Sequence, residues 1–475
     1  MPVHLNFHPE ATCSRAYKFA GAAMESITNT TMTLFAYISG FLLNLTLVRG
    51  FIASILIPIY LYQIAFAMIP HMVDHLFGLF TCSGRSNLAK KTDNHRWKSD
   101  TLAQSQLEGT YRFKPHEIFH VERTSRGWMS SAPWAGDDTQ EFTVCGASVR
   151  YIHIKASYSS VLADGKREHR PIVFLHGNPS WSYLWRNVFP SLLERGHDIY
   201  AIDWIGHGRS DKVLDKGRIT FELHMATLQE FFKHTGVEGA IVAAHDWGGC
   251  IALSTIPRLP PGTVDNLFLL NSFFPPRLSD SSLHYRLLNR IWSCTTSLLG
   301  GFLPISLVIR YLAPHLSKSD IDTFAAPYVD LPRSSKASIE RFAHTVPSLP
   351  RFILFTLRQT YLWKVLEGFL GPEQFNNLNV QARLSAQDDQ VRSYWSNKEE
   401  SLGASTEVAV VFGASDPLVR EYKDLLARIV HPERMVKWAP RGVWIEGAGH
   451  MAMEGKQGEV AGLIARFARG EGVKK

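Results

Sequence analysis

A carboxylate stands between a predicted strand and a predicted helix, in the segment Ala243-Ala244-His245-Asp246-Trp247-Gly248-Gly249. A β-forming run, 239–244, precedes it, and small residues open the helix that follows. Small neighbours on both sides permit a turn tight enough to expose the residue at its tip. An ionised Asp attacks without first losing a proton, so it suits saturated carbons that carry a leaving group. We therefore predict that Asp246 is a nucleophile whose intermediate is an ester; the alternative is an ordinary helix N-cap.

Several other motifs accompany this turn. They are Phe174-Leu175-His176-Gly177-Asn178-Pro179-Ser180, Tyr183-Leu184-Trp185-Arg186-Asn187, Ile202-Asp203-Trp204-Ile205-Gly206-His207-Gly208-Arg209-Ser210-Asp211, and later Ala326-Pro327-Tyr328, Arg341-Phe342 and Val346-Pro347. Together with the Asp246 turn they resemble the haloalkane dehalogenases of the α/β-hydrolase superfamily, over roughly residues 140 to 470. The resemblance implies an α/β-hydrolase fold and cleavage of carbon–halogen bonds through an alkyl-enzyme ester on Asp246, giving alcohol and halide.

The resemblance also implies a base and an acid that support the nucleophile. His450 follows the last predicted strand and resembles the family base, which takes a proton from the water that attacks the ester. Asp416 lies just past another strand and would hold the tautomer of that base. One branch of the family instead carries a Glu where Asn271 stands, and an amide cannot carry this charge. A structural His and a turn-forming Asp before Pro417 are the alternatives.

Asn178 and Trp247 bear on the identity of the leaving group. A departing halide needs weak, desolvated N–H donors rather than a proton, and the side-chain amide of Asn178 and the indole of Trp247 provide them. Their backbone N–H groups would form the oxyanion hole for ester hydrolysis. We therefore predict that both residues bind the halide of a small apolar halogenated substrate.

Two other functions stay open. Epoxide hydrolases share the Asp turn and often the following Trp, and they resemble one another in protonating the leaving oxygen from lid tyrosines. The candidates here are Tyr285, Tyr311, Tyr328 and Tyr361. Those enzymes usually carry an aromatic residue where Asn178 stands, which favours the dehalogenase. A non-hydrolytic or binding member of the fold is the third hypothesis, and an intact triad argues against it.

Alternating strand and helix patterns surround these residues. After a hairpin around Gly146, at 142–144 and 149–155, strands are predicted at 172–175, 198–202, 240–244 and 264–270, and helices at 185–193, 219–235 and from 249. That alternation is typical of a mostly parallel sheet with helices on both faces. The fold class is therefore α/β, and 140–272 is the predicted first part of the hydrolase core.

The alternation stops in 273–401, which has the pattern of amphipathic helices. We predict that this insertion is a helical lid, because ligands bind outside the carboxyl ends of the strands in such sheets. Strands resume at 408–412 and at either 435–439 or 443–446, and a helix follows at 457–469. These elements form the predicted second core part, 402–475.

The N-terminal part has a different character. After a tail, 1–31, two stretches nearly free of charge lie at 32–48 and 51–69. Each approaches the roughly 20 apolar residues that cross a bilayer. Basic residues on both flanks would place these flanks in the cytosol, with the catalytic domain. We predict membrane-anchoring helices within 32–80, as a hairpin or as one span plus an interfacial helix, and then a linker at 81–139. An apolar helix pair that caps the hydrolase or self-associates is the alternative.

The composition sets limits on partners. The 475 residues are 45% hydrophobic and 20% charged, as in a soluble globular protein with an apolar attachment. The net charge of +7 is modest, and basic residues beside the apolar stretches suit anionic lipid head groups. Five scattered cysteines without a Cys-x-x-Cys pair indicate a reducing compartment and no metal framework. We predict membrane lipids as partners, and no nucleic acid, metal or cofactor.

Overall fold

A computed structural model describes residues 112–121, 138–156, 170–274, 291–292, 295–296, 299–329, 331–345, 390–397 and 406–469. Two compact units divide the chain: Met1–Ser86 with Pro304–Val308, and Asn87–Leu303 with Ile309–Lys475. The second unit contains the sheet and all predicted site residues. The predicted anchoring helices lie outside the described residues, as does most of the predicted linker. Within the described ranges, no helix combines the length and the apolar character needed to span a bilayer.

An eight-stranded sheet forms the centre of the second unit, in the order β10-β9-β8-β7-β4-β5-β3-β2. The hairpin β2–β3 is antiparallel and joins β5 antiparallel, whereas the strands from β5 to β10 pair parallel. The strands are β2 (Thr139–Val144), β3 (Ala147–Ile154), β4 (Ile172–Leu175), β5 (Ile199–Ile202), β7 (Ala240–Asp246), β8 (Val264–Ser272), β9 (Glu407–Gly413) and β10 (Val443–Ile445). The central strands β4 and β7 are buried along their whole length, as parallel strands covered on both faces must be.

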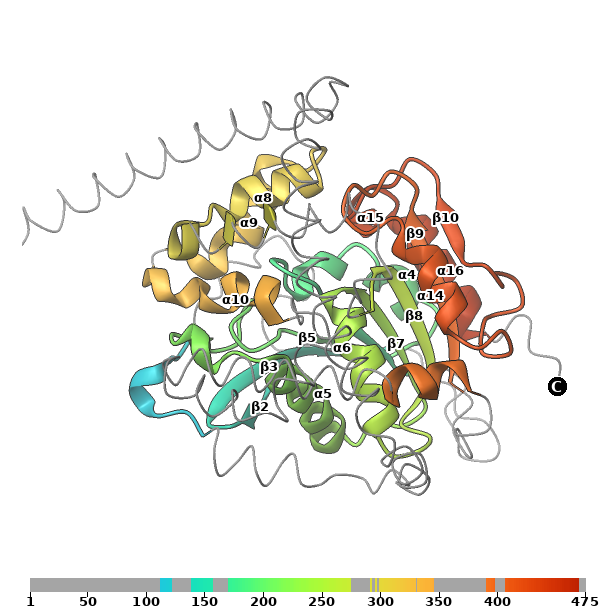
Figure 1. Ribbon diagram of the computed structural model, residues 1–475, viewed down its shortest axis with the longest axis horizontal. Coiled ribbons are helices and arrows are strands. Elements are labelled where there is room, and N and C mark those ends of the chain that lie inside the picture. Colours follow the sequence, from blue (N-terminus) through green and yellow to red (C-terminus); the bar gives the residue numbers. More distant parts are fainter. Residues whose placement is uncertain are drawn as a thin grey trace, which may run out of the picture. The chain divides into compact units, whose positions relative to one another are not determined.

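Helices cover this sheet on both faces. Connections between parallel strands of one sheet are right-handed. The connection from β4 to β5 and the connection from β5 back past β4 to β7 run in opposite directions along the sheet, so their helices α4 and α5 lie on opposite faces. α6 packs beside α5, and α16 packs beside α4 (Figure 1). The helices named here are α4 (Phe189–Leu193), α5 (Phe221–Thr235), α6 (Trp247–Thr255), α14 (Tyr422–Ile429), α15 (Ala452–Gly455) and α16 (Gln457–Ala468). The strand order reverses at β4, and β4 and β7 therefore flank the crevice where such sheets bind ligands.

Most predicted core elements are confirmed. The strand 172–175 matches β4 residue for residue, and the other predicted strands and helices differ from the observed ones by a few residues at their ends. Of the two candidates for the last strand, 443–446 is correct, because Met435 forms only an isolated bridge to Val408. The continuous helix predicted at 185–193 is wrong. A 3-10 turn, η3 (Ser182–Trp185), precedes α4, since Pro190 lacks an N–H and its ring fits only the first turn of a helix.

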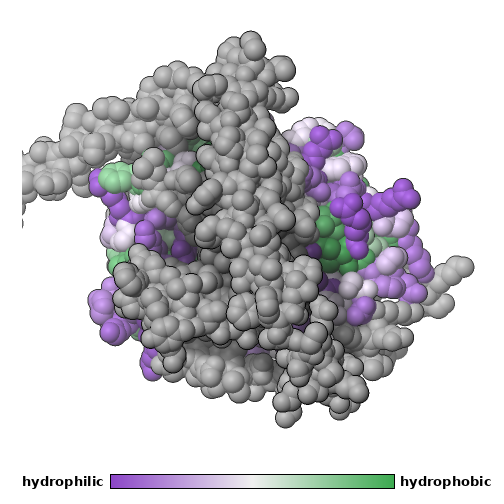
Figure 2. Space-filling model, viewed as in Figure 1, coloured by the Kyte–Doolittle hydropathy of each residue, from purple (hydrophilic) through white to green (hydrophobic). Residues whose placement is uncertain are grey.

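The insertion between β8 and β9 is helical where it is described. Its helices are α8 (Ile305–Leu312), α9 (Lys318–Ala325) and α10 (Ala337–Thr345), with 3-10 turns η6 (Gly300–Phe302), η7 (Ala326–Tyr328) and η8 (Arg333–Lys336). Much of 273–401 lies outside the described residues, and the lid role of this insertion stays a prediction. The exposed large apolar side chains among the described residues all belong to it: Ile291, Phe302, Tyr311 and Val329. On the face drawn in Figure 2, the described surface is hydrophilic in most places, and a hydrophobic patch lies on the right.

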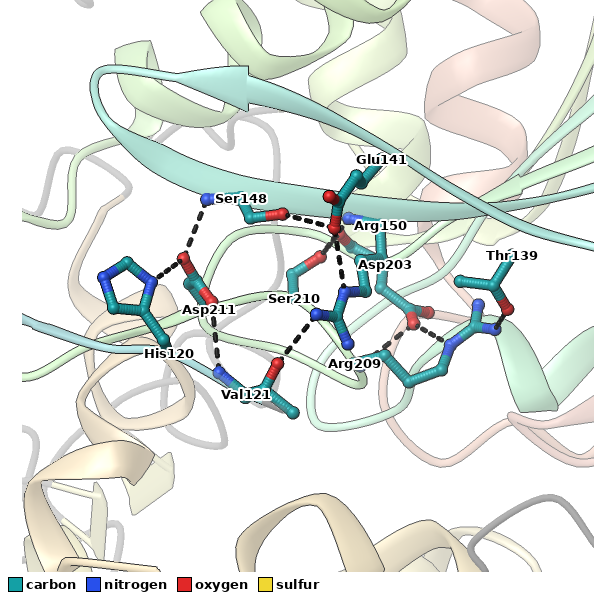
Figure 3. A network of polar contacts seen from close by, with 10 residues as sticks. All are labelled: His120, Val121, Thr139, Glu141, Ser148, Arg150, Asp203, Arg209, Ser210 and Asp211. Atoms are coloured by element: carbon teal, nitrogen blue, oxygen red, sulfur yellow. Dashed lines mark hydrogen bonds and ion pairs between the residues drawn. The ribbon is translucent and has the colours of Figure 1, made fainter. Parts of the chain in front are cut away.

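A polar network fixes the turn that follows β5 (Figure 3). The carboxylate of Asp203 accepts the N–H of Arg209 at 3.0 Å and pairs with its guanidinium at 2.8 Å. Asp211 accepts the N–H of Ser148 in β3 and contacts Nδ1 of His120, each at 2.8 Å. The short sheet formed by β1 (Ile118–Phe119) and β6 (Lys212–Val213) lies beside these contacts. The network thus joins the segment before the hairpin to the core and holds 203–211 in one conformation.

Candidate active site

Asp246 occupies a strained turn between β7 and α6. Its backbone angles are φ 51° and ψ −122°, a conformation that costs a residue with a side chain about 1–3 kcal/mol. The surroundings admit only glycine nearby: a Cβ on Gly177 would lie 2.4 Å from Oδ2 of Asp246, and one on Gly248 would lie 2.7 Å from the carbonyl of His176. The Asp246 side chain makes no capping hydrogen bond to α6. Asp246 stands at the N-cap position, but side-chain capping does not explain it, and the tight turn predicted around it is present.

The carboxylate of Asp246 is buried and faces backbone donors. Oδ2 accepts the N–H of Asn178 at 3.0 Å, and the N–H of Trp247 also bonds to the carboxylate. Burial raises the pKa of Asp246, and the nearby His450 and the two N–H groups only partly offset this. Because two backbone donors converge on one carboxylate, this position suits the oxygen of an ester as it becomes an oxyanion.

His450 and Asp416 meet beside the nucleophile. Nε2 of His450 lies 3.9 Å from Oδ1 of Asp246, and Nδ1 lies 3.0 Å from Oδ2 of Asp416. Burial alone would lower the pKa of His450, but the carboxylates of Asp416 and Asp246 raise it above its ordinary value. The structure therefore brings the three predicted catalytic residues together in the order that base catalysis requires, acid to imidazole to nucleophile.

Asn178 and Trp247 lie at the same place. Nδ2 of Asn178 donates to the carbonyl of Ile339 at 3.2 Å, and its second N–H remains for another acceptor. The indole of Trp247 packs edge-on against Phe273 and Phe342, with ring centroids 5.0 and 5.2 Å apart. The two predicted halide donors thus both belong to residues that contact Asp246 through their backbone N–H groups.

Comparisons with known proteins agree with this fold. Residues 170–293 match the family described as alpha/beta hydrolase fold. The structure of the tetrameric haloalkane dehalogenase DpaA from Paraglaciecola agarilytica NO2 superposes with a TM-score of 0.52 at 19% identity, covering 73% of this chain and 97% of that one. The chain has the α/β-hydrolase fold.

Curated relatives of this chain are named haloalkane dehalogenase. That of Psychrobacter cryohalolentis is 30% identical over 189 residues, which are 40% of this chain and 60% of the relative. That of Mycobacterium marinum is 27% identical over 198 residues, 42% of this chain and 63% of the relative. The match thus spans less than two thirds of the length of each relative.

Asn271 has a part in this site that the sequence did not indicate. Its Nδ2 donates to Oδ2 of Asp416 at 2.5 Å, and its Oδ1 accepts the N–H of Gly413 at 3.1 Å. Burial would raise the pKa of Asp416, but His450, Asn271 and the N–H of Leu418 hold it below its ordinary value. The signal available in the sequence was an amide side chain near the end of β8, the strand beside the one that Asp416 follows. The residue cannot replace the acid, but it keeps the acid ionised and in place.

His245 is a second residue that sequence reasoning missed. Its ring lies 4.8 Å from that of His450, and its Nε2 lies 2.9 Å from the His450 carbonyl oxygen. Burial and the adjacent His450 lower the pKa of His245 to about 3, so its ring is neutral and Nε2–H donates to that carbonyl. The residue before the nucleophile therefore holds the backbone of the base.

The tyrosines that would serve an epoxide hydrolase are placed differently from one another. The hydroxyl of Tyr328 donates to the carbonyl of Gly206 at 3.3 Å and is thus already engaged. More than half of the Tyr311 surface is exposed. Partial burial and then the charge of Asp416 raise the pKa of its hydroxyl, so Tyr311 lies within electrostatic reach of the triad. Tyr285 and Tyr361 lie outside the described residues. Over the described ranges, no cluster of three or more His, Cys, Asp or Glu is arranged to hold a metal.

A buried ion-pair network links α9 to the helix that follows His450. The guanidinium of Arg186 contacts Glu454 in α15 at 2.5 Å and Asp320 in α9 at 2.8 Å, and it stacks over the ring of Tyr183 at 4.0 Å. The Glu454 side chain is fully buried, and burial raises its pKa despite Arg186. The network therefore supports the loop that carries the base.

We expect Glu454→Ala to lower the free energy of unfolding by roughly 3 kcal/mol, because it leaves the Arg186 charge buried with one partner fewer. Urea denaturation followed by circular dichroism measures this loss. The matched control is the double variant Arg186→Met with Glu454→Leu, which removes both charges and should lose less than the single variant. A double variant that is less stable than the single one would contradict this explanation.

Proposed function

We propose that this protein is a hydrolytic dehalogenase that cleaves carbon–halogen bonds of small apolar haloalkanes. The observation that carries the proposal is the carboxylate on the strained turn, with Oδ1 lying 3.9 Å from Nε2 of His450. A carboxylate there forms alkyl esters at saturated carbon, whereas a hydroxyl there would form acyl esters. The homologues named haloalkane dehalogenase support the choice of substrate class.

The first step is displacement at carbon. Oδ2 of Asp246 accepts the N–H of Asn178, and Oδ1 lies nearer His450, so Oδ1 is the oxygen that attacks the carbon of the haloalkane. A carbon–oxygen bond forms as the carbon–halogen bond breaks, and the electron pair leaves with the halide. The free N–H of Asn178 and the indole N–H of Trp247 receive that halide.

The second step is hydrolysis of the ester. His450 takes a proton from water through Nε2 while the water oxygen attacks the carboxyl carbon of Asp246. The oxyanion forms at Oδ2, which the N–H of Asn178 already contacts, and the N–H of Trp247 bonds to the same carboxyl group. Asp416 stabilises the imidazolium through Nδ1. Collapse releases the alcohol and restores the carboxylate, so a haloalkane and water give an alcohol, halide and a proton.

The raised pKa of His450 predicts the pH dependence of the second step. Because the base must be neutral, ester hydrolysis should increase as pH rises through the pKa of His450, which the charge of Asp416 still raises when Asp246 is an uncharged ester. Asp416→Asn removes the charge that raises this pKa, so the rise should move to lower pH. The plateau rate should fall about 10²–10⁴-fold, because the imidazolium loses its partner. Single-turnover hydrolysis between about pH 5 and pH 9 measures both changes; an unshifted profile would contradict the role of Asp416.

Epoxide hydrolysis is the second candidate, and Tyr311 is the observation that favours it. A lid hydroxyl within electrostatic reach of Asp416 could protonate an alkoxide after Asp246 opens an epoxide. The amide of Asn178 beside the nucleophile favours halide instead, since a halide leaves without a proton.

Product analysis separates these functions. The purified full-length chain is incubated with 1-bromobutane, 1,2-dibromoethane and styrene oxide, and bromide and diol are measured. Bromide release that depends on Asp246 is expected. Diol without bromide would establish the epoxide hydrolase in its place, and neither product would favour a non-hydrolytic or binding member of the fold.

We also propose that residues 32–80 anchor the protein to a membrane, with the catalytic domain on the cytosolic side. The two stretches nearly free of charge and the basic residues that flank them support this proposal. Full-length protein should stay with membranes during carbonate extraction, whereas a chain without residues 1–80 should not. Equal release of both chains would contradict the proposal.

A further inference from the structure

The side-chain amide of Asn178 is held from two sides. Its Nδ2 donates to the carbonyl of Ile339 in α10 at 3.2 Å, and its Oδ1 lies 3.1 Å from Nε2 of His207. A carbonyl oxygen only accepts, so Ile339 determines which end of the amide is the nitrogen. The opposite end is then an oxygen, which also only accepts. Nε2 of His207 must therefore carry a proton and donate it to Asn178.

The ring of His207 is fixed in that role by its surroundings. Burial, and then the neighbouring His176, hold the pKa of His207 well below its ordinary value, so the ring is neutral and has a single N–H. Its other nitrogen, Nδ1, lies 3.4 Å from the hydroxyl of Ser338 and 3.4 Å from the carbonyl oxygen of Ile205. Both distances are longer than the 3.1 Å between Nε2 and Asn178, so the proton is better placed on Nε2. The ring also packs edge-on against Phe342, with centroids 5.0 Å apart. Ser338 and Phe342 both belong to α10, so this helix holds the ring from one side.

The backbone beneath His207 leaves it little freedom. Gly206 and Gly208, which flank it, have φ values of 85° and 46°. A Cβ on Gly206 would lie 2.2 Å from the Cβ of Ser338, so the turn touches α10. The Asp203–Arg209 pair closes the same turn (Figure 3). His207 therefore presents Nε2 to Asn178 from a fixed position.

We infer that His207 is a positioning residue for the halide site, an inference that rests on the proposed dehalogenase function. By donating Nε2–H to Oδ1 of Asn178, it holds the amide so that the nitrogen faces Ile339 and offers its second N–H to the leaving halide. An amide turned by half a rotation would present an oxygen lone pair to the departing anion and repel it. Donors fixed before the reaction stabilise developing charge without the cost of reorganisation.

A pair of substitutions at His207 tests this inference in the full-length chain. The terminal nitrogen of Gln in His207→Gln reaches the place of Nε2, whereas that of Asn in His207→Asn reaches only the place of Nδ1. In single turnovers of 1-bromobutane, His207→Asn should release bromide about tenfold more slowly, as for the loss of one hydrogen bond to the amide. The rate of ester hydrolysis should stay within about twofold, because the backbone N–H groups of the oxyanion hole are unchanged. His207→Gln should release bromide nearly as fast as the wild type.

His224 supplies the matched control. It lies in the same buried cluster, with its ring centroid 6.5 Å from that of His207, and neither of its nitrogens has a partner among the described residues. His224→Asn should therefore leave the rate of bromide release unchanged. Bromide release at the wild-type rate in His207→Asn, or release as slow in His207→Gln as in His207→Asn, would overturn the inference, and so would equal slowing of both steps. A wild type that releases no bromide would overturn the proposed function, and with it the inference.

Discussion

Asp246→Asn is expected to reduce bromide release from 1-bromobutane by about 10⁴-fold or more. The amide has the shape of the carboxylate, but it is neutral and has no oxygen able to displace halide from carbon. Because the substitution is isosteric, an oxygen can still accept the N–H groups of Asn178 and Trp247. Ion chromatography of bromide in single and multiple turnovers measures the loss.

The same substitution should not destabilise the fold at neutral pH. Burial raises the pKa of Asp246 in the folded protein, so the folded state binds this proton more tightly than the unfolded state does. Stability is therefore lost as pH rises from the unfolded pKa, about 4, through the folded pKa. At pH 7 the ionised side chain opposes folding, and Asp246→Asn should keep or raise the unfolding midpoint. The difference in unfolding midpoint between Asp246→Asn and the wild type should disappear below about pH 4, where the wild-type carboxyl is protonated in both states.

Two results would contradict the role of Asp246. Bromide release within tenfold of the wild type would show that another group attacks the carbon. A large fall in the unfolding midpoint at pH 7 would mean that lost activity reflects a damaged fold and not a missing nucleophile.

His450→Phe is expected to trap the ester. Attack by Asp246 needs no base, so bromide should appear in a single burst, whereas hydrolysis of the ester should slow about 10²–10⁴-fold without a general base. Intact mass spectrometry should then show one added alkyl group per chain, and peptide mapping should place it on Asp246. Phe preserves the ring packing against His245 and removes both ring nitrogens.

The trapped species also tests the order of the steps. The double variant Asp246→Asn with His450→Phe serves as the control and should carry no alkyl group. Normal turnover by His450→Phe would mean that the base is assigned wrongly. An adduct that persists in the double variant would mean that alkylation occurs elsewhere in the chain.

Local patterns in the sequence were sufficient to predict the core elements and the nucleophile turn. The run that became β4 is short, apolar and bounded by turn residues, so its limits could be read directly. The small residues around Asp246 likewise act within a few positions of it, where the chain itself imposes the contact. The 3-10 turn before α4 was within reach of the same reasoning, because Pro190 marks the start of a helix.

The order of Asp246, Asp416 and His450 along the chain was likewise visible, and with it the expectation that they meet. Only the fold shows how they meet. β7 and β8 pair in parallel with a register shift between His245 and Asp246, and this pairing sets where the nucleophile stands relative to the end of β8.

The supporting contacts were decided by the tertiary structure alone. His245 reaches the His450 carbonyl across 205 positions of sequence, and Asn178 reaches Ile339 across 161. Such contacts depend on strand register and on how loops pack against helices, and the residue types alone do not predict them. The sequence by itself determined which groups could react. The packing of strand ends and of α10 decided how those groups are oriented, because hydrogen bonds between distant residues require a fixed distance and direction.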